Sequence, residues 1–554
     1  MTKLVPAPRV AAGHSSVLAD GRAAFAERRW EDAYAGLSAA DLEQPLDSRD
    51  LALLGASAAL TRRDEVASQL QERGYAACLA EKDELGAARA AFWHGFRLAS
   101  LGETGRAKAW LARCERLLEN HDECAERGYL MLPRIHELLR VGNTQGAHAV
   151  ALAALAIGDR FGEPDLSALA RQLGGRALIE SGDVAGGMQL LDDAMLIATT
   201  EPVSELSKGL VYCAVVGSCQ RIFAVDRARE WSAVLDAWCA AQAQLGMFSG
   251  TCRVHRAELM RLGGAWSDAL DEVLLVASGA TADQHERSAA YYEQAEIHRL
   301  RGHVAEAELA YEHVSELGGD PQPGLALLRL EQGRLDVAVG AIRRAVATTR
   351  SALSRARFLP ACVEILLAAD EQASASQAAQ DLAEIADCYG TPVLRALSAQ
   401  ARGFVALAAG ESGDALVLLR EALGIWLELA APYSAARVRV GLSAAYAALS
   451  DIEGARLEFA AARAVFADLA AGPDLLHLGP PERGRAAAGL LLSSRELQVL
   501  RLAATGRTNK EIATTLGLSA RTIDRHVSNI LTKLSVPSRA AATSYAYENG
   551  LIYG

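Results

Sequence analysis

The sequence lacks several features that mark common classes of protein. Only 5% of its 554 residues are aromatic, and it contains no Gly-Lys dipeptide. A nucleotide-binding P-loop needs that dipeptide at the end of its glycine-rich turn, so ATP-driven switching is not expected. His-Glu-x-x-His, Gly-x-Ser-x-Gly, metal-spaced Cys/His clusters and the strand–helix alternation of a receiver domain are also missing. We therefore expect neither an enzyme nor a bound cofactor or metal.

Cysteines and apolar runs are equally informative. None of the nine cysteines (78, 114, 124, 213, 219, 239, 252, 362 and 388) forms a Cys-x-x-Cys pair, and all lie in apolar stretches. This pattern favours small buried side chains in a reducing compartment, with a redox sensor as the alternative. No apolar run approaches the ~18 residues of a membrane span, and no charged-then-apolar leader opens the chain. We expect a cytoplasmic protein that does not contact a membrane.

The charge is negative overall but unevenly distributed. Net charge is −12, whereas residues 491–554 hold eight Lys/Arg and four Asp/Glu and so carry +4. Residues 1–490 therefore carry −16. A basic end on an acidic body is typical of a DNA-binding domain joined to a module that does not bind DNA.

Residues 16–470 are rich in Ala and Leu and repeat a turn signature, Gly-x-x-x-x-Ala. It begins at Gly102, Gly142, Gly182 (with Gly187 in the Ala place), Gly264, Gly302, Gly333, Gly410 and, with Ser for Gly, Ser450. Most intervals are 31 to 40 residues, and two intervals of 82 and 77 predict unmarked units near Val225 and Asp370. Weaker copies stand at Arg28 and Arg62. Glycine permits a tight turn and Ala permits close helix approach, so about a dozen stacked helix pairs are expected.

These units resemble tetratricopeptide-type repeats, although 38–40 residues exceeds the usual length of that repeat. The resemblance implies an α-solenoid whose concave surface binds a peptide, a partner protein or a small effector. Six central aromatic residues fill gaps between Ala-rich helices or, alternatively, line such a site: Trp231, Trp238, Phe248, Trp266, Tyr291 and Tyr292. We expect residues 1–15 to be disordered and the Pro/Gly-rich residues 471–490 to form a linker.

Residues 491–554 have the start and stop signals of four helices. Ser493 with Glu496, and Thr508 with Glu511, are capping boxes, in which a hydroxyl and a carboxylate satisfy free backbone N–H groups. Gly506 and Gly517 are placed to end the first two helices, at about Thr505 and at Leu516. Ser519 caps a third helix, from Ala520 to about Ser535, and a fourth runs from Pro537–Ser538 to Gly550. This is the helix-turn-helix pattern.

The third helix has two distinct faces. An apolar stripe consists of Ile523, Val527, Ile530, Leu531 and Leu534. The opposite face holds Arg521, Asp524, Arg525, Ser528 and Thr532, which would reach base edges if the helix lay in a major groove. Residues between the faces, Thr522, His526, Asn529 and Lys533, are placed to meet phosphates, and we add Lys510 of the second helix. The alternative is an amphipathic surface helix whose polar face is solvated. A metal site at His526 is not expected, because no second ligand lies one turn away in the sequence.

The same stretch resembles the C-terminal domain of LuxR-type transcriptional regulators. The resemblance is carried by Leu-Ser-x-Arg-Glu (492–496), Val-Leu (499–500), Ala-x-Gly (504–506) and Asn-Lys-Glu-Ile-Ala (509–513), and by Leu516, Ser519, Thr522, His526, Ile530, Lys533-Leu534, Val536 and Arg539. It covers about an eighth of the chain. It implies a four-helix domain that binds double-stranded DNA as a homodimer, with dimer contacts by the fourth helix. Asp524, Arg525 and Ser528 would read bases, and Thr522, His526 and Lys533 would contact the backbone.

Two positions depart from the family pattern, which usually has a basic residue at Asp524 and an acid at Gln498. Asp524 either accepts a hydrogen bond from cytosine N4 or tethers Arg521 or Arg525. The predicted architecture is all-α, a tetratricopeptide-like solenoid (16–470) followed by a LuxR-type domain (491–554). The predicted function is operator binding controlled by an effector or protein partner, with RNA polymerase as a further candidate partner. The alternative is a protein-interaction scaffold with secondary DNA binding.

Overall fold

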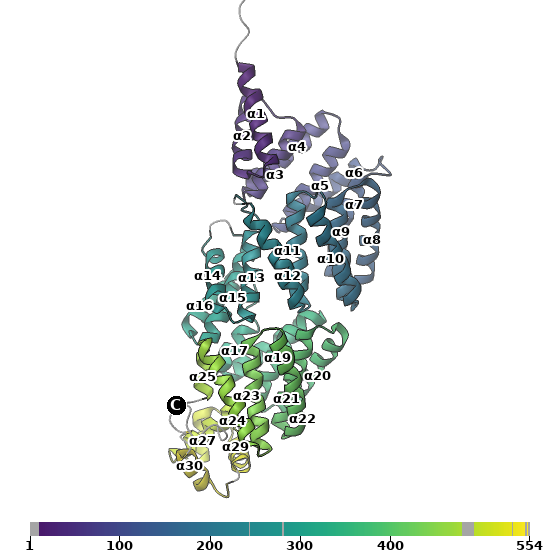
Figure 1. Cartoon of the computed structure of the whole chain (residues 1–554). Helices are drawn as coiled ribbons and strands as arrows, with labels where there is room; N and C mark the ends of the chain where they lie inside the picture. The colour runs from purple at the N-terminus through teal and green to yellow at the C-terminus, as the bar shows by residue number, and fades with distance from the viewer. Residues whose placement is uncertain are drawn as a thin grey trace, which may run out of the picture. The chain divides into compact units, whose positions relative to one another are not determined.

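Ala- and Leu-rich sequence has high helix propensity, and the chain is helical almost throughout. The computed structural model describes residues 10–242, 244–279, 282–478, 492–534, 536–548 and 551, and these ranges contain helices and no β-strand. The predicted all-α class is therefore confirmed. The chain divides into two units, residues 1–220 with 227–255, and residues 221–226 with 256–554 (Figure 1).

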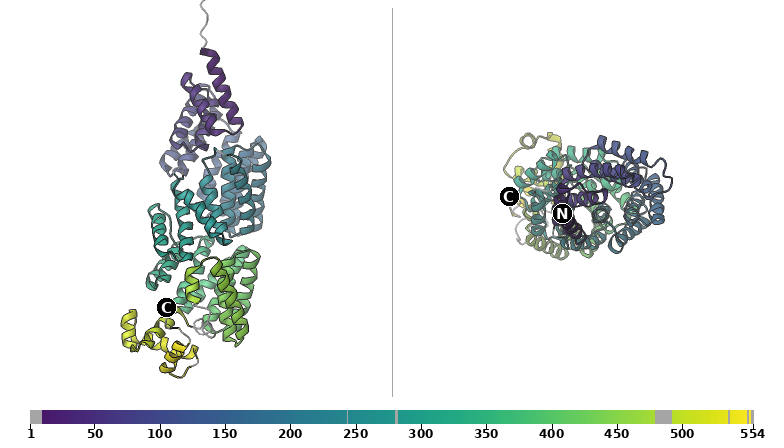
Figure 2. Two further views of the ribbon diagram at one scale, coloured as in Figure 1. Left: turned by 60° about the vertical axis from the view of Figure 1, so that its left-hand side comes forward. Right: turned by 90° about the horizontal axis from the view of Figure 1, so that it is seen from above.

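The first unit consists of helices that pair with their neighbours along the chain. They are α1 (Val10–Ala26), α2 (Trp30–Glu43), α3 (Ser48–Leu60), α4 (Asp64–Ala80), α5 (Glu84–Ser100), α6 (Thr104–Leu117), α7 (Ala125–Arg140), α8 (Thr144–Phe161), α9 (Pro164–Ser181), α10 (Val184–Thr200), α11 (Glu205–Arg221) and α12 (Val225–Ala240). Figure 2 shows α7 to α10 stacked side by side. Each pair therefore covers the apolar face of the next, as in a helical-repeat array.

The second unit continues the same pattern and then changes to shorter helices. Its paired helices are α13 (Ser249–Leu262, of which the part up to His255 belongs to the first unit), α14 (Trp266–Ala277), α15 (Gln284–Arg301), α16 (Val304–Glu316), α17 (Gly324–Glu331), α18 (Leu335–Thr348), α19 (Ala352–Ala368), α20 (Gln372–Tyr389), α21 (Pro392–Ala409), α22 (Ser412–Glu428), α23 (Pro432–Ala448) and α24 (Ile452–Asp468). The shorter ones are α25 (Gly472–Leu478), α27 (Ser494–Ala504), α28 (Asn509–Leu516), α29 (Ala520–Lys533) and α30 (Arg539–Glu548).

The turns inside the pairs lie where the repeat signature places them. Every signature position from Gly102 to Ser450 has a left-handed backbone, with φ between +66° and +100°. The unmarked units turn at Phe223 (φ +59°) and Asp370 (φ +60°), and the weak copies at Arg28 and Arg62 have the same conformation. The 40-residue spacing therefore locates the turn even where the residue is not glycine.

The small residue that follows each turn is buried against the first helix of its pair. The buried alanines are Ala33, Ala67, Ala107, Ala147, Ala269, Ala307, Ala338, Ala415 and Ala455. In α10 the position is Gly187, and a Cβ there would lie 2.6 Å from the carbonyl oxygen of Gly175 in α9. These two helices approach so closely that even alanine would not fit, which explains the departure from the signature.

Two predicted boundaries need correction. Helix α1 begins at Val10, inside the segment 1–15 that we expected to be disordered, because Val10, Ala11 and Ala12 continue the helix-forming composition. Within the predicted linker, Gly472–Leu478 forms α25, since Pro473 lies in the first turn, where its missing N–H costs nothing. Tyr433 Oη donates to Asp474 Oδ2 at 3.0 Å and holds α25 against α23. The rest of the predicted linker, 479–490, lies outside the described residues.

Candidate nucleic-acid interface

The C-terminal helices begin and end where their caps predict. Ser493 Oγ accepts from Glu496 N at 3.2 Å, and Glu496 Oε2 accepts from Ser493 N at 2.7 Å. Thr508 and Glu511 form the second capping box, with both hydrogen bonds present. Gly517 ends α28 in the left-handed conformation (φ +67°). The predicted end of the fourth helix, Gly550, lies outside the described residues.

The apolar stripe of α29 holds the domain together. Ile523, Ile530 and Leu534 are buried, and Val527 and Leu531 pack beside them. They meet a core formed by α27, α28 and α30, which includes Leu492, Val499, Leu500, Ala503, Ile512, Ala513, Ala542, Ala546 and Leu551. Burial of each large aliphatic side chain contributes about 1.5–3 kcal/mol, so this stripe fixes which face of α29 points outwards.

The opposite face of α29 is open to solvent. Arg521, Asp524, Arg525 and Ser528, the four predicted base-reading residues, are all exposed. Within the described part of the chain, neither Arg521 nor Arg525 makes a side-chain hydrogen bond or ion pair with another residue. Two free guanidinium groups near the start of one helix form a cationic surface with ten N–H donors, as recognition of base edges or phosphates requires.

Asp524 is held by a residue that the sequence did not indicate. Its Oδ1 accepts from Asn509 Nδ2 at 2.6 Å, and Asn509 Oδ1 accepts from Arg539 Nη1. Arg539 also donates to the carbonyl oxygen of Arg507. The suggested tether of Asp524 to Arg521 or Arg525 is therefore wrong. A chain of hydrogen bonds links α29 to the starts of α28 and α30, and its only sequence signal is that Asn509 and Arg539 both belong to the LuxR-type motif.

The residues predicted to contact phosphates are less uniform. Lys510 is exposed, Asn529 is half-buried, and Thr522 Oγ1 lies 2.7 Å from Ser519 Oγ at the start of α29. Lys533 Nζ donates to Glu496 Oε2 at 2.8 Å, across α29 and α27. Glu496 is almost fully buried, so Lys533 neutralises a capping carboxylate as well as facing solvent.

His526 differs from its expected position between the faces. Its side chain is only 5% exposed, and Nδ1 has no hydrogen-bond partner among the described residues. Burial lowers the pKa of the imidazole, so the ring is neutral at physiological pH. Rotation of α29 by part of a turn relative to the predicted faces explains this, because the i, i+3 and i+7 positions Ile523, His526 and Ile530 all point inwards.

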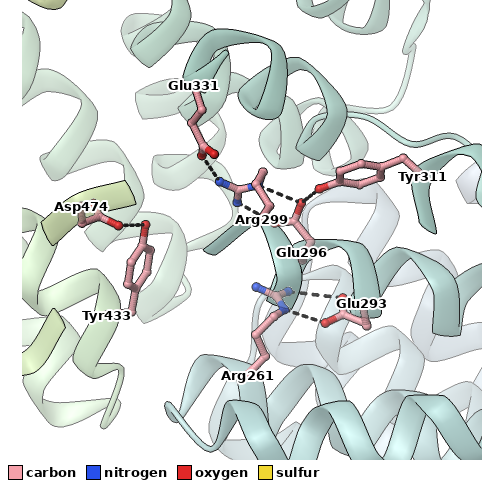
Figure 3. Close-up of polar contacts among 8 residues, drawn as sticks. All are labelled: Arg261, Glu293, Glu296, Arg299, Tyr311, Glu331, Tyr433 and Asp474. Atoms are coloured by element: carbon pink, nitrogen blue, oxygen red, sulfur yellow. Dashed lines mark hydrogen bonds and ion pairs between the residues drawn. The ribbon is translucent and has the colours of Figure 1, made fainter. Parts of the chain in front are cut away.

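A second cluster of charged residues lies in the second unit, where Glu293, Glu296 and Arg299 are buried (Figure 3). Arg261 Nε donates to Glu293 Oε2 at 2.6 Å. Arg299 bridges two carboxylates, Glu296 through Nη2 and Glu331 through Nη1, both at 2.9 Å. Tyr311 Oη donates to Glu296.

Burial alone would raise the pKa of Glu296, but the positive charge and hydrogen bonds of Arg299 lower it to about 2. Both Glu296 oxygens and both terminal nitrogens of Arg299 are used by protein partners. The cluster is therefore an ion network that links α13, α15, α16 and α17.

The remaining chemistry-bearing side chains form no further centre in the described residues. No group of three or more His, Cys, Asp or Glu is arranged to hold a metal there, and none of the described helices is long and apolar enough to cross a membrane. Six cysteines are buried, Cys213 and Cys239 are half-buried, and Cys388 is exposed. Of the central aromatic residues, Trp238, Phe248 and Trp266 are buried, as expected for residues that fill gaps between helices.

Comparison with known proteins agrees with the geometry of the C-terminal domain. Residues 490–546 match the family described as bacterial regulatory proteins, luxR family. The transcriptional regulatory protein LiaR of Bacillus subtilis is 46% identical over 61 residues, which is 11% of this chain and 29% of LiaR. The response regulator protein VraR of Staphylococcus aureus is 44% identical over 62 residues, 11% of this chain and 30% of VraR. The chain thus spans less than a third of the length of these relatives.

A solved structure described as the APC/C hetero-tetramer Cut9-Hcn1 includes a chain that aligns with 96% of this protein, and 96% of that chain is covered, at 11% identity and a TM-score of 0.43. The assignment of helical repeats in this protein depends on its own helix pairs and turns. One segment of the chain holds the two capping boxes, the buried stripe of α29, the two exposed arginines and the sequence matches. Residues 490–546 form a LuxR-type helix-turn-helix domain.

Proposed function

We propose that the protein is a DNA-binding transcription regulator. Its LuxR-type domain binds an operator through α29, and its helical repeats control that binding through an effector or a partner protein. The main observation is the exposed face of α29, where Arg521 and Arg525 have no partner while the opposite face fills the core. The names of the relatives, a transcriptional regulatory protein and a response regulator, support the same role.

In this proposal α29 lies in the major groove with Arg521, Arg525 and Ser528 at base edges. Arg525 donates bidentately to a guanine, the commonest specific contact of arginine. Asp524 uses its free Oδ2 to accept from a cytosine N4 group while Oδ1 stays bonded to Asn509. Lys510, Thr522, Asn529 and Lys533 face phosphates. His526 contributes by packing and not by donating to a phosphate, because its ring is buried.

The operator is expected to have two similar half-sites about 34 Å apart, because helix-turn-helix domains commonly bind as symmetric dimers. Dimer contacts would come from α30, as in the family that the domain resembles. Sedimentation of the full-length protein with a labelled operator should give two chains per duplex. If only one chain bound each duplex, and the operator contained only one half-site, the dimer would be contradicted.

The test of DNA binding uses the full-length protein and the genomic DNA that co-purifies with it, which is sequenced to obtain the operator. Replacement Arg525→Ala should weaken operator binding by about 1–3 kcal/mol, or about 5- to 150-fold, and relax preference at one base pair. Arg456→Ala removes an exposed arginine from α24 and should leave affinity unchanged. Equal affinities for the wild type and Arg525→Ala across operator variants would refute base reading by this helix.

Control by the repeats is tested by operator binding of the full-length protein with and without a fraction of cell extract that contains only small molecules, and again with a fraction that contains proteins. A change in affinity with either fraction supports control by the repeats. Identical affinity under all three conditions would contradict it.

A further inference from the structure

The first unit contains a cavity of about 840 Å³ that none of the observations above requires. Its walls come from α3, α4 and α5, from the turn before α2, and from the first residues of α9 and α11. All these segments lie within the first unit. The volume falls in the range of about 300–1,000 Å³ that is typical of small-molecule sites.

Small residues of α3 and α5 line the cavity. On α3, Ala52 and Ala56 are four residues apart and share one face. On α5, Gly86 and Ala90 are also four residues apart, and Trp93 follows on the next turn. Larger residues at Ala52, Ala56 or Ala90 would fill part of this space. The alanine-rich composition therefore leaves room here that it does not leave in the cores of the helix pairs.

Several residues that line this space make contacts with distant parts of the first unit. Trp30 Nε1 donates to Gln242 Oε1 at 3.0 Å, and Leu60 O accepts from the backbone N–H groups of Gly246 and Met247 at 2.9 and 3.0 Å. Arg28 forms an ion pair with Glu205 at 3.0 Å. Arg28 and Glu205 both line the cavity, so residues far apart in the sequence contribute to one wall.

Charged groups on the walls are already paired with one another. Arg28 is bound to Glu205, and Arg89 lies 2.7 Å from both Glu126 and Glu163. The carboxylate of Asp165 accepts from the N–H of Ser204 and from two serine hydroxyls. The other two lining charges, Arg49 and Asp83, are exposed to solvent. Away from the exposed Arg49, a charged ligand inside the cavity would therefore lose its hydration without gaining an unpaired counter-charge.

The aromatic residues Phe25, Trp30, Trp93 and Tyr129 also line the cavity. Phe25 packs edge-on against Trp30, and Trp93 packs against Tyr129 with ring centroids 6.0 Å apart. Trp93 and Phe25 are only half-buried, so part of each ring is free to contact a ligand. Aromatic surfaces of this kind favour flat apolar molecules through stacking and edge contacts.

We propose that this cavity binds an uncharged, aromatic or polycyclic small molecule. It would be the effector of the proposed regulator, and in that respect the inference rests on the proposed function. Binding would stabilise the packing of α3, α5 and the start of α11, because the ligand touches all three. The cavity and its ligand class can be tested without DNA, so failure of operator binding and failure of this inference are separate results.

The probe is Nile red, a neutral polycyclic dye whose emission shifts to the blue in apolar sites, titrated into the full-length protein. Ala56→Trp and Ala90→Phe fill the cavity from opposite walls, at half-buried positions. Ala444→Trp, at a half-buried position in α23 outside the cavity, adds the same ring and serves as the control. Melting temperatures identify any variant that fails to fold, and the other filling variant then decides.

We expect one Nile red per chain with blue-shifted emission, affinity weakened at least about tenfold by either filling variant, and no change with Ala444→Trp. The anionic dye 1-anilinonaphthalene-8-sulfonate should bind at least about tenfold more weakly than Nile red. Absent or unsaturable Nile red binding, or equal binding by the wild type and both filling variants, would overturn the proposed site. Equal or tighter binding of the anionic dye in the same cavity would overturn the ligand class.

Discussion

The ion pair between Lys533 and Glu496 gives the sharpest test of how the C-terminal domain is built. The replacement Lys533→Met keeps the length and apolar stem of the side chain and removes its charge. Glu496 is 2% exposed, and its Oε2 accepts from Lys533 Nζ at 2.8 Å and from Ser493 N at 2.7 Å. Without Lys533 a buried carboxylate would keep only the backbone donor.

The magnitude follows from the burial of the two partners. Breaking a fully buried pair costs about 3–5 kcal/mol, whereas exposed pairs contribute about 0–1 kcal/mol. Glu496 is buried, but the side chain of Lys533 is 39% exposed. Water can therefore partly take the place of the lost ammonium group in Lys533→Met. We expect Lys533→Met to destabilise the domain by about 1–2 kcal/mol, a factor of about 5–30 in its opening equilibrium.

Hydrogen exchange of the full-length protein measures this opening directly. Backbone amides in α27 and α29 should exchange about 5–30 times faster in Lys533→Met, while those in the helical repeats remain unchanged. Lys510→Met removes another exposed lysine of the same domain and should not change exchange. In a double-mutant cycle with Glu496→Gln, the two replacements should be non-additive by about 1–2 kcal/mol.

The competing hypothesis assigns Lys533 to a DNA phosphate alone. In that case Lys533→Met would reduce the salt dependence of operator binding by about one unit and leave exchange in α27 unchanged. Unchanged exchange would refute the structural role. A slope change together with faster exchange would show that Lys533 has both roles.

Three further predictions concern single side chains. Ser493→Ala should cost about 1 kcal/mol of domain stability through loss of the cap, seen as faster exchange in α27. The pKa of Glu296 is lowered from 4.5 to about 2, so the ionised carboxylate stabilises the folded chain. This contribution is complete above pH 4.5 and is lost as the pH falls from there towards 2. Between pH 5 and 3, the urea midpoint should therefore fall less steeply for Glu296→Gln than for the wild type. Gly410→Ala, at φ +81°, should lower the free energy of unfolding by about 1 kcal/mol and so lower the urea midpoint. Ala430→Gly, at φ +48°, should raise the urea midpoint.

Local features were the most predictable from sequence. A turn needs a left-handed residue at one position, and the repeat period predicted turns near Val225 and Asp370, where Phe223 and Asp370 have that conformation although neither is glycine. Caps behave in the same way, since Ser493 and Glu496 are three residues apart and meet wherever a helix starts. Each of these predictions depends on a few neighbouring residues and on no tertiary contact.

Contacts between distant residues were not predictable. Lys533 and Glu496 are 37 residues apart, and their pairing depends on how α29 crosses α27. The cavity of the first unit depends on contacts such as Trp30–Gln242, across 212 residues. Small changes of angle at each repeat accumulate along the array, so a sequence period does not show where its two ends meet. The inward position of His526 has the same cause, since helix rotation is set by packing.

The hydrogen bond between Asn509 and Asp524 determines what α29 can offer to DNA. An exposed aspartate three residues after Arg521 on the same helix would ordinarily pair with that arginine and occupy its donors. Asn509 takes Asp524 Oδ1 instead, and Arg539 holds Asn509 in place from the start of α30. Both arginines on α29 therefore remain free, although the helix carries an acid where the family usually has a base. Loss of Asn509 should transfer Asp524 to a neighbouring arginine, so this position controls DNA affinity without facing the duplex itself.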